Sequence, residues 1–167
     1  MQLEKYMHDR GDTDFIGVFS ADTLPRVEKL QLGNTFIVNC SDHTDGTHWV
    51  AMACPKRPGD QPEYFDSYGF PPDGENIILH TRSQFSGYLN SMASKFNSKG
   101  FIYNRANLQQ STSSYCGHYA IYFCLNGMPL DSDGGVNPAW KAVYNPYGSS
   151  FLSDKAIAAL VKISIHE

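Results

Sequence analysis

The sequence contains no apolar run long enough to cross a membrane and no long run of basic residues. It carries 13 Lys and Arg against 17 Asp and Glu, a net charge of −4, and its longest basic run is Lys56-Arg57. A bilayer span needs about 18 to 20 apolar residues, and nucleic-acid binding is favoured by a basic patch. We therefore expect neither a membrane nor a nucleic acid as a partner. Residues 1–5 lack the basic-then-apolar pattern of a signal peptide, which predicts a soluble, intracellular protein.

Cys-x-x-Cys pairs, internal repeats, low-complexity tracts and long linkers are also absent. The four cysteines stand at 40, 54, 116 and 124, and Cys116-x-His118 is too closely spaced for a structural zinc site. A chain of 167 residues buries enough core to fold without disulfides. We expect reduced thiols, no bound metal, and one domain over residues 1–167, since a domain has about 150 residues.

Apolar residues make up 41% of the chain and charged residues only 18%, a composition typical of a folded core. β-branched and aromatic residues gather in four segments that predict strands. These strands are expected over 34–40, 47–54, 63–68 and 101–103, with turn-rich loops such as Asp42 to Gly46 between them. An apolar stripe at helical spacing predicts a helix over 83–96; its members are Phe85, Leu89, Met92 and Phe96.

The apolar run from Tyr115 to Leu125 predicts a buried helix, because residue types that cap helices lie on both sides of it. Ser113-Ser114 precede the run and Asn126-Gly127 follow it. A last helix is expected from Ser153 or Asp154 to about Ile163. The order of strands, helix, strand, helix and helix indicates an α+β domain.

Cys116 differs from the other cysteines because it lies at the start of the predicted buried helix. Unpaired backbone N–H groups and the helix dipole favour an anion there, which lowers the pKa of a thiol and produces thiolate. Cys40, Cys54 and Cys124 lie in apolar segments and are expected to fill the core. Cys116 is therefore the candidate nucleophile.

A cysteine nucleophile needs an imidazole to accept its proton and a carboxylate or amide to orient that imidazole. His118 is two residues from Cys116 and points to a different side of a helix, whereas His48 begins a strand and can project into a cleft. Asp66 lies in an aromatic strand, where a carboxylate is rarely buried without a partner. If these two strands pair antiparallel, both side chains reach the same edge. The alternatives are a histidine that is merely structural and an aspartate that caps a turn.

Gln109 and Gln110 lie seven and six residues before Cys116. A glutamine amide there could turn back beside the helix N-terminus and, with the backbone N–H of Cys116, bind the oxyanion of an acyl-transfer reaction. The alternative for each is a surface loop residue.

Three blocks of the chain resemble the adenovirus maturation protease (adenain) and the related ubiquitin-like-protein (SUMO) proteases. They are Thr47-His48-Trp49, Tyr64 to Phe70, and Gln109 to Gly117. Asp14 to Phe19 also looks like the opening of the adenoviral enzyme, so the resemblance covers about residues 14–125. It implies a central mixed β-sheet flanked by helices, with the nucleophile at the N-terminus of a buried helix.

The resemblance also implies roles for the residues. His48 would be the general base, Asp66 its orienting group, Cys116 the nucleophile and a glutamine the oxyanion donor. The SUMO-protease spacing selects Gln110, which we favour, and the adenoviral spacing selects Gln109. Both relatives prefer glycine before the scissile bond, which implies a narrow channel. Trp49 is a candidate wall of that channel, with core packing as the alternative.

The expected activity is that of a thiol protease, an endopeptidase that cleaves a protein or polyprotein after glycine-containing sites. By resemblance, this is virion maturation for a virus or mobile element, in the host nucleus, the cytoplasm or the virion. The alternatives are an isopeptidase that removes a ubiquitin-like modifier and an inactive protease-like binding module.

The adenoviral enzyme is activated by DNA and by a peptide that is disulfide-linked to a cysteine upstream of the nucleophile. Residues 98–103 contain no cysteine here, and the chain is acidic. Neither form of activation is therefore expected, and no cofactor is predicted. The oligomeric state stays open.

Overall fold

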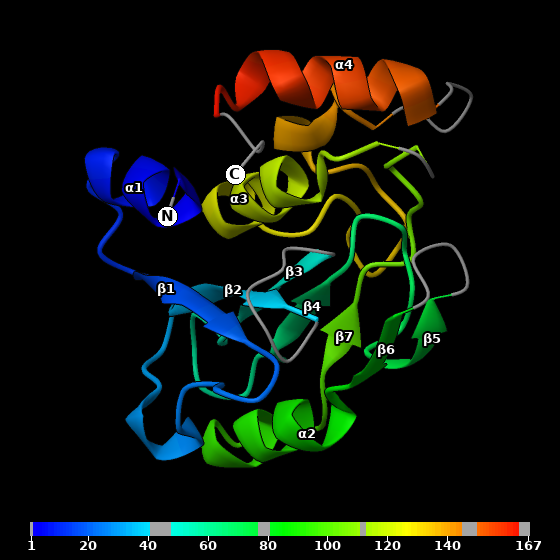
Figure 1. Cartoon of the computed structure of the whole chain (residues 1–167). Coiled ribbons are helices and arrows are strands. Elements are labelled where there is room, and N and C mark those ends of the chain that lie inside the picture. Colours follow the sequence, from blue (N-terminus) through cyan, green and yellow to red (C-terminus); the bar gives the residue numbers. More distant parts are fainter. Residues whose placement is uncertain (1, 41–47, 77–80, 111–112, 145–149, 164–167) are drawn as a thin grey trace.

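The computed structural model describes residues 2–40, 48–76, 81–110, 113–144 and 150–163. Within these ranges, five strands form one sheet in the order β1-β2-β3-β4-β7. The strands are β1 (Phe15–Ser20), β2 (Thr35–Asn39), β3 (Trp49–Ala53), β4 (Glu63–Phe65) and β7 (Ile102–Tyr103). The central pairs are antiparallel, whereas β1 runs parallel to β2 and β7 parallel to β4, so the sheet is mixed. A separate hairpin joins β5 (Asp73–Asn76) to β6 (Thr81–Gln84) (Figure 1).

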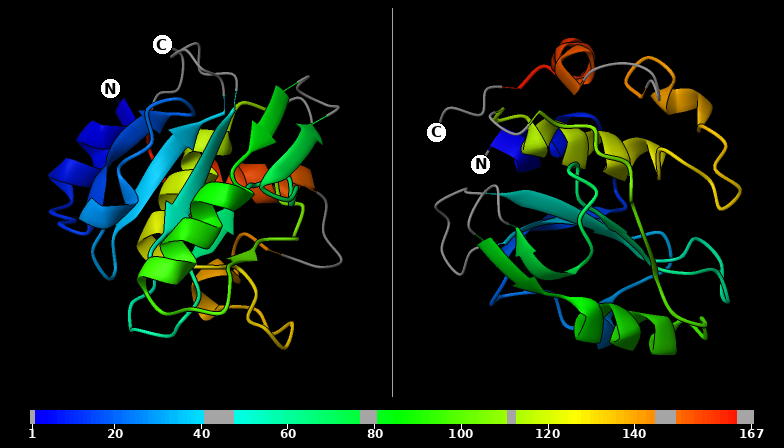
Figure 2. Two further views of the ribbon diagram at one scale, coloured as in Figure 1. Left: turned by 90° about the horizontal axis from the view of Figure 1, so that it is seen from below. Right: turned by 90° about the vertical axis from the view of Figure 1, so that its right-hand side faces the viewer.

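Helices cover both faces of the sheet. On one face lies α3 (Cys116–Asn126), with α1 (Gln2–Asp9) beside it and α4 (Ser150–Leu160) stacked on its outer side (Figure 1). On the other face lie α2 (Ser86–Lys95) and a short 3₁₀ helix (Val27–Lys29) (Figure 2). The expected α+β class, with a central mixed sheet between helices, is confirmed. No helix in the described ranges combines the length and apolarity needed to cross a bilayer.

Strand β3 is buried on both faces and separates two apolar clusters. Because side chains alternate along a strand, Trp49 and Ala51 point towards α3, whereas Val50 and Met52 point towards α2. On the α3 side, Phe65 of β4 stacks on Phe123 with ring centroids 5.0 Å apart. This burial on both faces explains why the β3 segment is apolar throughout rather than alternating.

The predicted strands over 34–40, 47–54, 63–68 and 101–103 are present with shorter bounds, whereas two predicted helix starts were wrong. Residues 81–84 form β6, so α2 begins at Ser86 rather than Ser83. Helix α4 begins at Ser150, before the predicted start at Ser153 or Asp154, and ends at Leu160. The predicted loop from Asp42 to Gly46 lies outside the described residues.

Helix α1 and the strands β1, β5 and β6 escaped prediction. The β5 sequence Asp73-Gly74-Glu75-Asn76 consists of residue types that are depleted in strands. Helix α1 carries only two buried apolar residues, Leu3 and Met7, one turn apart. Neither pattern is strong enough to predict a helix or a strand from the sequence.

Candidate active site

Pairing of β3 with β4 brings His48 and Asp66 together. The two strands are antiparallel with Ala51 opposite Phe65, so His48, just before β3, and Asp66, just after β4, lie at the same end of the pair. His48 Nε2 is 3.0 Å from Asp66 Oδ2, and the two side chains are only 2% and 5% exposed. The contact is a close ion pair rather than a well-aligned hydrogen bond. The antiparallel arrangement expected from the sequence is thus the observed one.

The carboxylate of Asp66 is fixed by a turn that immediately follows β4. Its Oδ1 accepts a hydrogen bond from the Tyr68 N–H (2.8 Å), which leaves Oδ2 directed at the imidazole. The Asp66 carbonyl accepts from the Gly69 N–H (2.8 Å) and from Asn104 Nδ2 (2.9 Å). Asn104 also bonds both ways with the Ala106 backbone. Each of these bonds restricts the turn, so the acceptor for His48 is preorganised.

The surroundings of His48 raise the pKa of its imidazole. Burial is the largest influence and by itself lowers that pKa, but the Asp66 carboxylate and the Cys116 thiol together outweigh it. A buried imidazole between an aspartate and a thiol group therefore holds its proton at neutral pH. The Tyr68 ring packs beside the imidazole, with centroids 5.4 Å apart and an angle of 33° between the ring planes.

Cys116 is the first residue of α3 and is buried. The N-cap position is Tyr115, which makes no side-chain hydrogen bond to the helix, so the predicted capping by Ser113-Ser114 was wrong. The first turn thus lacks a side-chain cap, and its N–H groups and the positive end of the helix dipole lie at the thiol.

The other three thiols lie in environments that suppress ionisation. Burial raises the pKa of Cys54 and of Cys124 to about 12. The pKa of Cys40 is also raised, first by burial and then by the charges of Asp66 and Cys116. Because a thiolate is the reactive form, the raised pKa values disfavour reaction of these three thiols at neutral pH.

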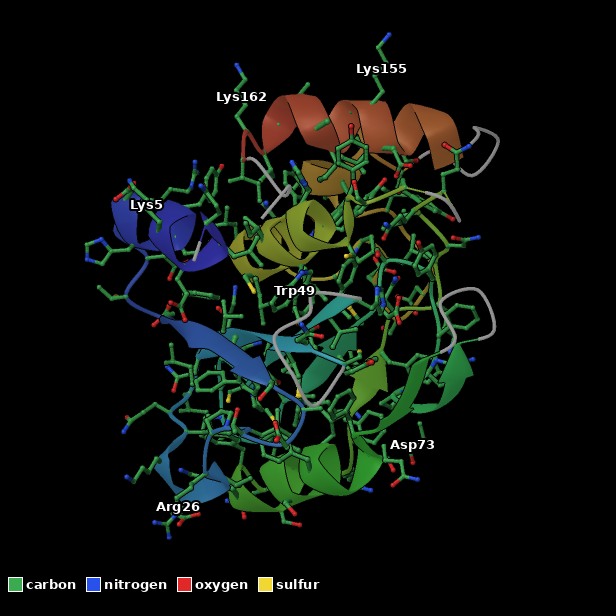
Figure 3. All side chains as sticks on the ribbon, viewed as in Figure 1. Lys5, Arg26, Trp49, Asp73, Lys155 and Lys162 are labelled. Carbon is green, nitrogen blue, oxygen red and sulfur yellow. The ribbon has the colours of Figure 1, made fainter. Side chains whose placement is uncertain are left out.

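Trp49 lies between the sheet and α3, as its label in Figure 3 shows. A Cβ at Gly117 would meet Leu3 Cδ2 at 3.1 Å and Trp49 Cδ1 at 3.8 Å, so both side chains pack against the start of α3. Glycine at 117 allows this close approach beside Cys116. The core-packing alternative for Trp49 therefore describes its contacts, and these contacts place the indole next to Gly117, the neighbour of Cys116.

His118 is the histidine closest to Cys116 in sequence, but it does not contribute to the His48–Asp66 pair. It is buried, and burial lowers the pKa of its imidazole to about 4. Its ring packs edge-on against Tyr115, with centroids 5.0 Å apart. His118 is thus a neutral packing residue of α3.

The two adjacent glutamines differ in exposure and in partners. Gln109 is only 2% exposed, and both ends of its amide are engaged: Oε1 accepts from Ser67 Oγ (2.5 Å) and Nε2 donates to the Ser113 carbonyl (3.0 Å). Gln110 is exposed, and its backbone N–H donates to Asp154 Oδ2 (3.2 Å). Gln109 therefore ties the segment before α3 to the turn that carries Asp66, whereas the Gln110 amide is accessible.

Asn104 and Asp154 were missed as site residues, although both contact the segments that hold the candidate residues. Asn104 follows the two-residue strand β7, and no local pattern marks it. Asp154 was noted only as a possible helix start. The bond from Asn104 to Asp66 joins residues 38 positions apart, and the bond from Gln110 to Asp154 joins residues 44 positions apart. Only long-range proximity identifies these contacts.

Gly69 allows the turn after Asp66 to pack against residues 105–106. Its φ is +78°, and a Cβ there would lie 2.7 Å from the Arg105 carbonyl oxygen. We expect Gly69→Ala to lower the free energy of unfolding by more than about 2 kcal/mol, because left-handed strain and a backbone clash act together. Gly59→Ala is the matched control, since Gly59 also has a positive φ but no neighbour within 4 Å. It should cost about 1 kcal/mol. Equal losses in denaturant unfolding would show that the clash is relieved.

No model of a known protein family matches the chain, and no curated protein matches it. In the part of the chain that the structure describes, no group of three or more His, Cys, Asp or Glu side chains could hold a metal ion. The candidate site itself presents a thiol at the N-terminus of α3 and a buried imidazole whose pKa is raised.

Proposed function

We propose that the chain is a cysteine endopeptidase with Cys116 as nucleophile, His48 as general acid and base, and Asp66 as the group that orients His48. The observation that carries this proposal is the buried His48–Asp66 pair at 3.0 Å, with Cys116 contributing to the raised pKa of the same imidazole. A thiolate beside an imidazolium is the reactive state of such a pair.

In the proposed reaction, the Cys116 thiolate attacks the carbonyl carbon of the scissile peptide bond. The resulting oxyanion accepts hydrogen bonds from the backbone N–H of Cys116 and the side chain of Gln110. His48 gives its proton to the departing amine, and the C–N bond breaks to leave a thioester on Cys116. His48 then takes a proton from water, which attacks the thioester, releases the acid and restores the thiolate.

The proposed substrate is a protein or polyprotein with glycine before the scissile bond. Support comes from the resemblance to the adenoviral and SUMO proteases, which prefer glycine at that position. By the same resemblance, we propose that the natural substrates are structural proteins of a virus or mobile element.

The test is to incubate the protein with a library of glycine-containing peptides and, separately, with a folded ubiquitin-like modifier fusion. Cleavage of short peptides, followed by mass spectrometry of the products, supports the endopeptidase. Cleavage of the folded fusion alone would replace it by the isopeptidase. No cleavage of either, together with failure of an alkylating reagent to label Cys116, would favour an inactive binding module.

The two glutamines should respond differently to alanine substitution. We expect Gln110→Ala to lower kcat by about 10²-fold with little change in melting temperature, because it removes one oxyanion donor. Gln109→Ala should instead lower the melting temperature, because it leaves the buried Ser67 hydroxyl without its acceptor. Steady-state kinetics and thermal unfolding of both variants measure these effects. The reverse pattern would assign the oxyanion role to Gln109.

A further inference from the structure

Helix α4 contributes a buried carboxylate to the segment that precedes Cys116. Asp154 is 4% exposed. Its Oδ1 accepts a hydrogen bond from Tyr119 Oη (2.7 Å), and its Oδ2 accepts one from the Gln110 N–H (3.2 Å). The Asp154 side chain thus links α3, through Tyr119, to the backbone of Gln110.

Asp154 occupies a position that an apolar residue would otherwise take. It is spaced three residues from Ile157, which packs in the core beneath α4, so the two share one face of the helix. Figures 1 and 2 show that this helix lies on the outer side of α3. Burying a carboxylate is costly unless hydrogen bonds compensate it. A helix that only covered α3 would not need an acid here.

Asp154 and two other residues restrict the backbone of Gln110 through hydrogen bonds. The Gln110 carbonyl accepts a hydrogen bond from the Ser113 N–H (3.0 Å) and a longer one from Tyr68 Oη (3.5 Å). Asp154 holds the N–H of the same residue. Tyr119, the other partner of Asp154, lies in α3 one turn after Cys116. The backbone of Gln110 is therefore fixed on both sides relative to the start of α3.

We propose that Asp154 is a positioning residue for the oxyanion side of the active site. It fixes the main chain at Gln110 and so directs the Gln110 amide to the oxyanion that forms beside Cys116. This role rests on the proposed protease function. It acts through Gln110 and does not involve the His48–Asp66 pair, which other elements hold.

The test compares Asp154→Asn with Lys155→Ala. Asparagine keeps the shape of the side chain but removes its negative charge and replaces one acceptor oxygen by an NH₂ donor. The Gln110 N–H is then left with an uncharged, weaker acceptor or, if the NH₂ group faces it, with none. Lys155 is the neighbouring residue on α4; its side chain points away from the protein in Figure 3, and its substitution should leave kcat unchanged. We expect Asp154→Asn to lower kcat by about 10- to 100-fold, with KM changed less than about threefold.

Two further measurements separate positioning from general structural support. Alkylation of Cys116 by iodoacetamide forms no oxyanion, so its rate should be the same in Asp154→Asn and wild type. Hydrogen exchange at the Gln110 and Ser113 amides should become faster in Asp154→Asn, while exchange in the C-terminal half of α3 stays the same. Tyr119→Phe removes one hydrogen bond to the Asp154 carboxylate and should lower kcat less than Asp154→Asn does. This second variant keeps the test valid if Asp154→Asn does not fold.

Wild-type kcat in Asp154→Asn would overturn the proposal. So would a parallel fall in kcat, alkylation rate and melting temperature, because that pattern indicates loss of the fold rather than of one geometry. If the wild type cleaves no peptide, the protease function itself fails, and hydrogen exchange alone decides whether Asp154 positions the segment. Unchanged exchange at Gln110 would then refute it.

Discussion

Replacement of Cys116 by serine is expected to abolish peptide cleavage, with kcat/KM at least about 10³-fold below wild type. A serine hydroxyl stays protonated beside an imidazole that already holds its own proton, so no nucleophilic anion forms. The substitution is nearly isosteric at the buried first residue of α3, and the melting temperature should change little. Peptide-cleavage kinetics and thermal unfolding measure both effects.

Cys124→Ser is the matched control, because Cys124 lies on the same helix and burial raises the pKa of its thiol to about 12. It should retain wild-type cleavage. Iodoacetamide at neutral pH should label Cys116 and leave Cys40, Cys54 and Cys124 unmodified, as peptide mass spectrometry can establish. Substantial cleavage by Cys116→Ser, or preferential labelling at another cysteine, would rule out the proposed nucleophile.

Replacement of Asp66 by asparagine is expected to lower kcat/KM by about 10²- to 10⁴-fold. Burial lowers the pKa of His48, and the Asp66 carboxylate is the largest influence that raises it. Without that charge, the pKa of His48 falls and the imidazolium is lost at a lower pH. The rate of Cys116 alkylation, measured as a function of pH, should change at alkaline pH where the imidazolium loses its proton. In Asp66→Asn the midpoint of this alkaline change should lie more than about one pH unit lower than in the wild type.

Asp60→Asn provides the control for Asp66→Asn. Asp60 is exposed and pairs with Arg57 in the loop between β3 and β4, so its substitution should leave the pH profile in place. An alkaline change that stays at the wild-type pH in Asp66→Asn would show that Asp66 does not control the protonation of His48.

The His48–Asp66 pair makes the free energy of unfolding depend on pH. The pKa of His48 is higher in the folded protein than its ordinary value of 6.5, so folding favours the protonated form. The stabilisation is fully present below about pH 6.5 and is lost as the pH rises through the folded-state value. In Asp66→Asn this loss should shrink or disappear, which denaturant unfolding at about pH 6 and about pH 9.5 would detect.

The glutamine pair illustrates a choice that the sequence leaves open. Gln109 and Gln110 are chemically identical neighbours, and their distances to Cys116 differ by one residue. Their exposure depends on which amide reaches Ser67, a residue 42 positions away. No local pattern encodes that contact. The separation into a buried structural glutamine and an accessible one therefore comes from the packing of two distant turns.

The sequence alone determined the central elements and the candidate pair. Apolar runs and β-branched segments are local signals, so β2, β3, β4 and α3 could be placed from composition and periodicity. Cys116 at the start of α3 follows from the same local signals, and the meeting of His48 with Asp66 follows once β3 and β4 are taken as an antiparallel pair. Tertiary structure decided the roles of Gln109, Asn104 and Asp154. Each of these side chains is defined by hydrogen bonds to residues far away in the chain, and such contacts leave no periodic trace in the sequence.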